Sequence, residues 1–371
     1  MGEIRTMERK LASVQRIVAI EPIEGADRIV KADVLGWHCV TQKDNNFKVG
    51  DLVVYHEIDS LLPLDKPAYS FLKDPNKPND TNYRLRTKRF KKQIAQGLIL
   101  PLDVVIPDWQ IQSAIRIEEG ADLTEFLGIT KYEPEMPAQL RGIAKGSFPY
   151  FLVKTDETRI QSEPGVLTRR KGELMYACEK VDGSSHSSWY YPNEKATDIG
   201  LPVSPEDQDR GYTFGVASRN LTLARSEDNA FWKTADKYQL EDKLKEYGRP
   251  LGIQGEMFGI GIQDNKLKRQ SVELAVFNVY DLAIKQYLDR DDFLKVVSDL
   301  GLTPAPLVYE PFVLDHTVDQ LVMMSMIKSK LNPDVWAEGI VVRPVKESTE
   351  KGLGRFSFKV INPEFLLKHG E

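Results

Sequence analysis

The sequence predicts a multidomain chain in which an all-β domain is followed by an α+β domain. Residues from about 8 to 110 form short strand-like runs separated by Gly, Asp and Asn. Residues 131–149 are rich in Pro and Gly, which is typical of a linker. Beyond them, strand-like runs alternate with helical stretches. We therefore expect a β domain at 1–130, a linker at 131–149 and an α+β domain at 150–371.

The composition is that of a globular protein, with 371 residues, 41% hydrophobic and 28% charged, and a net charge of −5. No apolar run approaches the length of a membrane span, and the start is charged where a signal peptide needs an apolar core. Cys39 and Cys178 are too few for a disulfide scaffold, and five scattered histidines without CxxC leave no zinc site. We expect a monomer in the cytoplasm or another reducing compartment, neither secreted nor membrane-bound.

The first domain is expected to be a small β-barrel. Strand-like patterns occur at 13–23, 27–40, 50–58 and 93–102, a density that fits a small barrel or sandwich. The stretches GADRIVKADV and FKVGDLVVYHEIDSLLP resemble the OB-fold of tRNA-binding domains, which implies an OB-fold β-barrel. The loop between Pro63 and Tyr83 is too rich in Pro and Asn for a regular element.

A basic cluster follows that loop, with Tyr83 and Phe90 among its cations. The cluster consists of Arg84, Arg86, Lys88, Arg89, Lys91 and Lys92. A solvated edge strand produces such a run too, because lysine keeps exposed sheet edges from pairing. On an OB barrel, basic and aromatic side chains on the strand face are the usual nucleic-acid surface. We favour nucleic-acid binding over simple solvation.

The second domain is expected to combine helices with an antiparallel sheet. Residues 231–248 and 288–301 place apolar side chains at helical spacing, and each stretch ends on a glycine. Strands are expected at 252–262, 273–282, 338–344 and 355–362. This alternation is typical of an α+β fold.

The segment CEKVDGSSHSS contains a lysine at the end of an apolar run. Lys180 and Asp182 share a face of the predicted strand, and Gly183 allows a close approach of the backbone to a ligand. Lysine beside apolar neighbours is costly unless its charge is paired or suppressed. Lys180 is therefore either one partner of a structural ion pair or a reactive amine.

The last predicted strand separates its side chains by face. Phe356, Phe358 and Val360 share one face, whereas Arg355, Ser357, Lys359 and Ile361 share the other. Two cations on one face repel each other unless an anion lies between them, and a polyphosphate would serve. The alternative is a pair of solvated cations on an exposed face.

Six segments of the second domain resemble, in order, motifs I, Ia, III, IIIa, IV and V of the covalent nucleotidyltransferases, the polynucleotide ligases and mRNA capping enzymes. They are Lys180-Val181-Asp182-Gly183, Ser218-Arg219-Asn220, Gly255-Glu256, Phe277-Asn278-Val279-Tyr280-Asp281, Glu338-Gly339-Ile340-Val341-Val342 and Phe358-Lys359-Val360-Ile361-Asn362. The preceding FPYFLVKTDETRIQS resembles the same region of repair-type RNA ligases. Because the OB-like domain comes first, the chain resembles RNA ligase family 5, and this implies an ATP-grasp-like, ligase-type nucleotidyltransferase domain with antiparallel sheets.

The resemblance implies a role for each candidate residue, with ATP as substrate and Mg²⁺ or Mn²⁺ as the metal. Lys180 is the nucleophile, with its pKa lowered by burial, by Lys359 and Arg355, and by the metal. Phe277 stacks on adenine, Arg219 and Glu256 hold the ribose, and Lys359 grips the α-phosphate. Lys154 or Arg159 contacts the leaving pyrophosphate. Glu338 and, through water, Ser185 hold the metal, while Glu179, Asp182 and Gly183 line the nucleotide site.

The chain departs from related ligases in its last motif, where Ile361 replaces a second lysine. We expect Arg355, on the same predicted face, to supply that cation. The function expected is an ATP-dependent RNA ligase sealing 3′-OH/5′-phosphate breaks, in nicked duplexes with RNA on the 3′-OH side. The alternatives are another polynucleotide ligase, a capping-type nucleotidyltransferase, or a non-catalytic nucleic-acid-binding protein.

Overall fold

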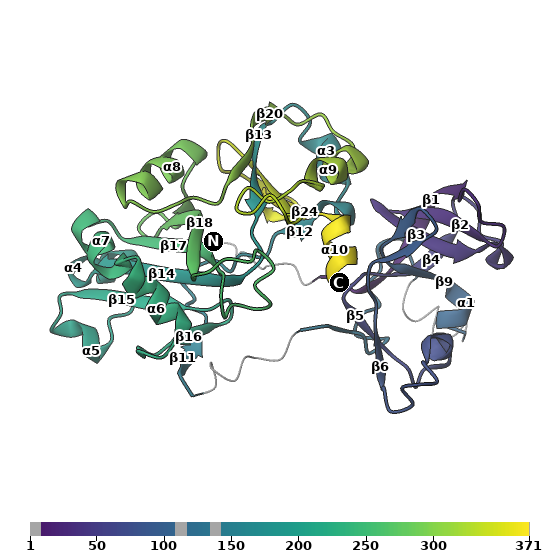
Figure 1. Cartoon of the computed structure of the whole chain (residues 1–371), viewed down its shortest axis with the longest axis horizontal. Coiled ribbons are helices and arrows are strands. Elements are labelled where there is room, and N and C mark those ends of the chain that lie inside the picture. The colour runs from purple at the N-terminus through teal and green to yellow at the C-terminus, as the bar shows by residue number, and fades with distance from the viewer. Residues whose placement is uncertain (1–8, 108–116, 134–141, 371) are drawn as a thin grey trace.

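The computed structural model describes residues 9–107, 117–133 and 142–370. It places an N-terminal β domain at one end of an elongated molecule and an α+β body at the other (Figure 1). The charged start of the chain and residues 134–141 of the predicted linker lie outside the described residues. Within the described part of the chain, every helix is too short or too polar to cross a membrane.

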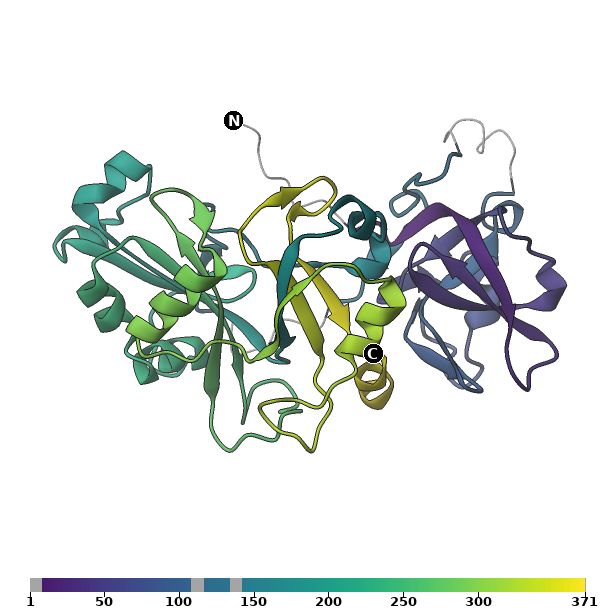
Figure 2. The ribbon, with the colours of Figure 1, turned by 90° about the horizontal axis from the view of Figure 1, so that it is seen from above.

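The N-terminal domain is built on a five-stranded antiparallel sheet, which curls into a half-barrel (Figure 2). Its order is β3 (Trp37–Gln42), β2 (Ile29–Val34), β1 (Ala12–Pro22), β4 (Leu52–His56) and β9 (Leu98–Pro101). The long β1 pairs with β4 through its first half and with β2 through its second, and a register shift separates Ile17 from Ala19. Such a bulge bends a strand, so β1 belongs to both halves of the curl. The predicted OB-fold is confirmed.

Smaller elements close this domain. They are the sheet of β10 (Thr130–Lys131), β5 (Ser60–Pro63) and β6 (Asn82–Arg84), the hairpin of β7 (Lys88–Phe90) and β8 (Gln93–Ala95), and helix α1 (Leu102–Val105). The loop after Pro63 is more regular than predicted, because Pro67–Leu72 forms a 3₁₀ helix. Tyr69 within it is fully buried and hydrogen-bonded to His56 at 2.9 Å. Core packing therefore orders a segment whose composition indicated only a loop.

The α+β body contains a seven-stranded antiparallel sheet. Its order is β11 (Ala144–Ser147), β16 (Leu221–Leu223), β15 (Tyr212–Ala217), β14 (Ser184–Pro192), β17 (Leu251–Phe258), β18 (Glu273–Asp281) and β19 (Gln286–Tyr287). The helices associated with it are α4 (Asn193–Ile199), α5 (Pro205–Gln208), α6 (Ala230–Lys237), α7 (Leu240–Tyr247) and α8 (Arg290–Asp299). β11 falls within the predicted linker but pairs with β16. The domain boundaries themselves remain a prediction.

The helical stretch predicted at 231–248 is two helices rather than one. Gln239 has a left-handed backbone (φ 52°) and separates α6 from α7. Gly248 ends α7 in the same left-handed region, as its position predicts. The break lets Phe231, Trp232, Leu240 and Leu244 all pack into one core.

A second, five-stranded sheet carries the nucleophile motif. Its order is β12 (Thr158–Arg159), β24 (Phe358–Ile361), β21 (Gly339–Pro344), β13 (Leu174–Lys180) and β20 (Leu307–Val313). It is accompanied by α3 (Gly165–Arg169), α9 (Val318–Ser325), α10 (Pro363–His369) and the hairpin of β22 (Thr349–Glu350) and β23 (Gly354–Arg355). Phe356, Phe358 and Val360 are fully buried in one core, as their alternation predicts.

The C-terminal helix α10 lies between the two domains (Figure 1). Ile361, Phe365 and Leu366 join a core otherwise formed mainly by OB residues, including Trp37 and Tyr55. Polar contacts extend this interface: Gly36 N donates to Gln161 O at 2.9 Å and Ser162 Oγ to Glu57 Oε1 at 3.2 Å. The OB domain is therefore packed directly against the sheet that carries the nucleophile motif.

Candidate active site

Lys180 is the last residue of β13 and pairs with Gly339, the first residue of β21. Glu338, just before that glycine, is thereby brought beside it, and Lys180 Nζ donates to Glu338 Oε2 at 2.6 Å. The two side chains are 27% and 15% exposed. Gly339 has φ +156°, and a Cβ there would lie 2.2 Å from Val360 O. Only glycine fits at this close approach of the paired strands β21 and β24, and Glu338 immediately precedes it.

Two more carboxylates surround Lys180. Burial lowers the pKa of Lys180, but Glu338, Glu256 and Asp182 outweigh it and the net shift is upward. The prediction that Lys180 has a lowered pKa is therefore wrong for the ligand-free protein. The sequence could not reveal this excess of negative charge, because the carboxylates come from three separate segments.

The pKa values of two of these carboxyl groups, Glu256 and Asp182, are shifted as well. Burial, opposed by Lys180 and reinforced by Glu338 and Asp182, raises the pKa of Glu256 to about 8. Burial and Glu338 raise the pKa of Asp182 to about 6, against Lys266, whose Nζ lies 3.2 Å from its Oδ1. Ser185 on β14 pairs with Glu256 on β17. Strongly shifted carboxyls gathered around one lysine are typical of a catalytic site.

Three cations gather a short way from Lys180. Lys359 of β24 donates to Asp156 Oδ1 at 3.0 Å, and Arg219, in the turn between β15 and β16, lies 2.8 Å from Asp156 Oδ2. Lys154 donates to Asn220 Oδ1 in the same turn, at 3.3 Å. Burial, Lys180 and Arg159 lower the pKa of Lys359, against Asp156.

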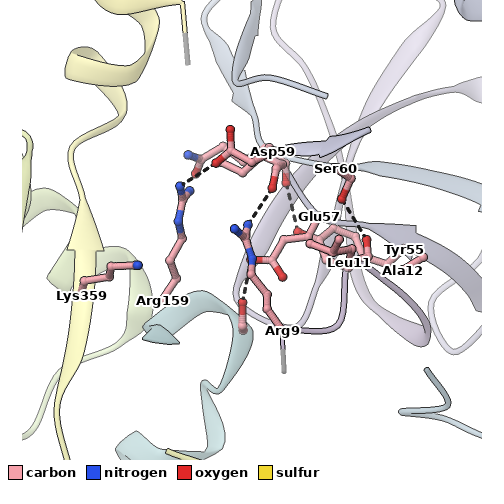
Figure 3. Close-up of polar contacts among 12 residues, drawn as sticks. Arg9, Leu11, Ala12, Tyr55, Glu57, Asp59, Ser60, Arg159 and Lys359 are labelled. Atoms are coloured by element: carbon pink, nitrogen blue, oxygen red, sulfur yellow. Dashed lines mark hydrogen bonds and ion pairs between the residues drawn. The ribbon is translucent and has the colours of Figure 1, made fainter. Parts of the chain in front are cut away.

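Arg159 extends this cationic region toward the OB domain, as Figure 3 shows. It sits on β12 opposite Lys359 of β24 and reaches Asp59 Oδ2 at 3.3 Å. Its side chain is only 10% exposed, yet within the described part of the chain its Nε and Nη1 have no hydrogen-bond partner. A buried guanidinium with free donors beside a lysine is suited to binding an anion.

Arg355 lies elsewhere than predicted. It belongs to β23 in a separate hairpin rather than to the strand of Lys359. Its guanidinium pairs with Glu347, donates to Asn278 Oδ1 at 2.8 Å and stacks 3.8 Å from the Tyr287 ring. The expectation that Arg355 shares a strand face with Lys359 is wrong, because the strand begins only at Phe358. Arg159, not Arg355, is the cation paired in register with Lys359.

The remaining residues that were predicted to bind the nucleotide make different contacts in the fold. Phe277 is half-buried and packs beside Tyr176 and Cys178 of the nucleophile's sheet. The Glu179 side chain is buried and accepts from Ser329 Oγ and Lys330 N at 2.5 and 2.7 Å, so it holds a loop. Gly183 is required by the fold as well, since a Cβ there would lie 2.3 Å from Met257 O.

Comparison with known proteins decides the family. A sequence model of the RNA ligase family matches residues 173–361, and a model of an OB-fold domain matches residues 11–102. The chain belongs to the RNA ligase family. The resemblance drawn from the six motifs is thereby confirmed.

Solved structures of Naegleria gruberi RNA ligase are similar to this ligase over nearly its whole length. A glutamate variant with ATP and Mn has a TM-score of 0.82, 32% identity, and coverage of 98% of this chain and 100% of that chain. A lysine variant with AMP and Mn has a TM-score of 0.82, 32% identity and coverage of 98% and 99%. The protein with PPi has a TM-score of 0.81, 32% identity, and coverage of 98% of this chain and 99% of that chain. No curated protein matches the chain.

A divalent cation would fit the ligase between carboxylate oxygens rather than inside a dense cluster. Among the described residues, no group of three or more His, Cys, Asp or Glu side chains is placed to hold a metal ion directly. Mg²⁺ and similar ions keep several waters and need only one or two protein carboxylates when a phosphate supplies the rest. Glu338, with Ser185 as a donor to water, fits that requirement.

The predicted nucleic-acid cluster divides in the folded ligase. Arg84 is partly buried, paired with Asp59 at 2.9 Å and stacked on Tyr132 at 3.7 Å, so it belongs to the domain interior. The other five cations are exposed on or near the β7–β8 hairpin. Of these, Lys88 donates to Tyr83 at 2.5 Å and Arg89 pairs with Glu364 of α10. The hairpin is thereby joined to the helix that links both domains.

Several functional candidates gave no signal in the sequence. Asp156 joins Lys359, predicted to bind the α-phosphate, to Arg219, predicted to hold the ribose, and Asp59 binds Arg159 across the domain interface. Glu157 forms a buried pair with Arg343 at 2.9 Å. Asp156 and Glu157 lie in the segment KTDETRIQS, and its resemblance to repair ligases implies roles only for its cations, Lys154 and Arg159. Their partners are about 60 to 200 residues away in the chain, so spacing could not indicate them.

Proposed function

We propose that this protein is an ATP-dependent RNA ligase that seals 3′-OH/5′-phosphate breaks through lysyl-AMP and an adenylylated 5′ end. One observation carries the proposal: Lys180 lies between an acidic group, Glu338, Glu256 and Asp182, and a cationic group that contains Lys359. A metal beside the first group and phosphates on the second would place a nucleotide against the amine. The relatives' structures contain ATP, AMP or PPi, and those with ATP or AMP also contain Mn.

In this proposal the Lys180 amine attacks the α-phosphorus, a P–N bond forms, and pyrophosphate leaves. Lys359 binds the α-phosphate, while Arg219 and Glu256 hold the ribose. Phe277, half-buried beside the nucleophile's sheet, stacks on the adenine. Arg159 or Lys154 receives the pyrophosphate, and the buried, unpartnered donors of Arg159 favour it for this role.

The amine must lose a proton before it attacks. In the ligand-free protein Lys180 stays protonated, because its nearest carboxylate, Glu338, stabilises the ammonium form. A divalent cation held by Glu338 would supply positive charge beside Lys180 and so lower its pKa. When Glu338 holds a metal ion instead of pairing with Lys180 alone, metal binding is thus linked to activation of the proposed nucleophile.

RNA binding is proposed for the exposed cations Arg86, Lys88, Arg89, Lys91 and Lys92. Phe90, 38% exposed among them, offers a surface on which a base can stack. We propose a nicked duplex with RNA on the 3′-OH side as the substrate and a monomer as the active form. Cys39 and Cys178 are both free and buried, which supports a reducing compartment.

Incubation with labelled ATP or GTP and Mg²⁺ or Mn²⁺ tests the proposal. We expect acid-labile, alkali-stable label from ATP alone, and Lys180→Ala should abolish it. Lys145→Ala, which removes an exposed lysine paired with Glu206, is the matched control and should label normally. Label from GTP would indicate a capping-type enzyme, and no label from either nucleotide would indicate a binding protein. Sealing of matched RNA and DNA nicks then identifies the substrate.

A further inference from the structure

The cationic group around Lys359 contains an acidic residue for which the proposed reaction has no use. Asp156 accepts from Lys359 Nζ at 3.0 Å through Oδ1 and lies 2.8 Å from Arg219 Nη2 through Oδ2. The two cations belong to β24 and to the turn after β15, so one carboxylate joins separate elements. Each oxygen serves one cation, and a phosphate oxygen could take the place of the carboxylate oxygen on Lys359.

We propose that Asp156 is an exchangeable counter-anion, which orders Lys359 and Arg219 before the nucleotide arrives, is displaced from Lys359 by a phosphate group of the nucleotide and so releases Arg219 to the ribose. This inference rests on the proposed function, because it assigns an occupant to the same site. Asp156 acts through its two cations and is therefore a positioning residue.

The charges explain why such a group is needed. Lys359 is partly buried, and Lys180 and Arg159 are close enough to disfavour its charged form, whereas Asp156 favours it. Without an anion, these like charges would repel each other. The carboxylate offsets the repulsion and favours the charged form of Lys359 until a phosphate takes its place.

The structure also provides a route for the carboxylate to leave. The next residue, Glu157, is anchored to Arg343 at 2.9 Å, and Thr158 and Arg159 are paired with β24. The Asp156 side chain is nevertheless 46% exposed. Rotation of this one side chain brings the carboxylate into water while the anchored backbone stays in place. Exchange for a phosphate therefore requires no refolding of the segment.

ATP binding to the full-length Lys180→Ala variant in EDTA, measured by calorimetry, tests the exchange. Adding Asp156→Asn removes the competing charge and should tighten ATP binding about two- to fivefold, the size of effect expected when one partly exposed charge pair is exchanged. Asp156→Glu retains the charge and should bind close to the parent. Glu206→Gln removes an exposed carboxylate paired with Lys145 at 2.9 Å and should change nothing.

With Lys180 restored, Asp156→Asn should lower the KM for ATP in lysyl-AMP formation without raising kcat. A merely structural role would instead lower kcat or the midpoint of unfolding. Unchanged or weaker ATP binding by a folded Asp156→Asn protein overturns the inference; Asp156→Ser gives the same comparison if the asparagine variant does not fold. If the parent itself binds no ATP, the proposed function fails and the inference fails with it.

Discussion

The acidic and the cationic groups of the site shift the pKa values of their lysines, Lys180 and Lys359, in opposite directions. Lys180 and Lys359 lie on β13 and β24, the two strands that flank β21, and burial disfavours the charge of both. Three carboxylates around Lys180 reverse that effect and raise its pKa. Lys359 has one carboxylate, Asp156, and two neighbouring cations, and its pKa is lowered.

The comparison teaches that burial alone does not make a lysine reactive. In the ligand-free protein Lys180, the proposed nucleophile, has its pKa raised, whereas the pKa of Lys359 is lowered. Its activation must come from a change in the surrounding charge, which a metal ion and a nucleotide bring. Of the four variants below, one tests the acidic group, two test the cationic group and its support, and one tests the exposed hairpin outside the site.

Glu338→Gln should have the largest effect. It removes both the carboxylate proposed to hold the metal and the nearest counter-charge of Lys180, and we expect lysyl-AMP formation to fall about 100- to 1,000-fold. Because Glu338 raises the pKa of Lys180, its loss lowers that pKa. In the protein without metal and nucleotide, the reactivity of the Lys180 amine toward an acylating reagent should therefore begin to rise at lower pH than in the wild type. A rise at the same or higher pH would contradict this assignment of charge.

Lys359→Ala tests the cationic group. It removes the cation proposed for the α-phosphate, and lysyl-AMP formation should fall about 100-fold, as for loss of one electrostatic transition-state contact. The matched control is Lys295→Ala, on the exposed face of α8, where the lysine is 70% exposed and pairs with Asp299. Equal rates in the two variants would remove Lys359 from the phosphate site.

Glu157→Gln tests the support beneath the cationic group. Burial by itself would raise the pKa of Glu157. The nearby cations Arg343, Arg355 and Lys359 outweigh burial and lower this pKa from 4.5 to about 2. Since the folded-state pKa is depressed, the stabilisation is present above about pH 4.5 and is lost as pH falls toward 2. A shift of this size corresponds to at most about 3 kcal/mol in the free energy of unfolding.

Urea unfolding at several pH values measures this contribution. The stability difference between wild type and Glu157→Gln should be largest near neutral pH and should shrink below about pH 4. Glu206→Gln, at an exposed position, should show little difference at any pH. A gap for Glu157→Gln that stays constant with pH would mean that the ion pair with Arg343 is not its origin.

Lys88→Ala combined with Lys91→Ala should have the smallest effect and none on the acidic or the cationic group. Lysyl-AMP formation should match the wild type, whereas RNA binding should weaken, with a salt dependence shallower by about one to two phosphate contacts. Nick binding at several salt concentrations measures both quantities. An unchanged salt slope would mean that the hairpin is only a solvated edge.

Local patterns predicted much of the fold. The period-two alternation of Phe356, Phe358 and Val360 predicted their burial, and the glycine at 248 predicted the end of a helix. The fold predictions that were wrong failed because of contacts between segments that are distant in the sequence. The hairpin of β22 and β23 takes Arg355 out of the strand of Lys359, and left-handed Gln239 divides a helical pattern in two. Both depend on packing partners that lie far away in the sequence.

The sequence by itself determined the family and the domain order and predicted the nucleophile, because six short motifs in fixed order each carry chemistry that few other residues can supply. Only the tertiary structure decided the charge state of Lys180, the partners of Arg159 and the place of Asp156. Electrostatic effects depend on distance in space, and the charges that matter here come from segments about 60 to 200 residues apart. Folding alone brings them within a few ångströms.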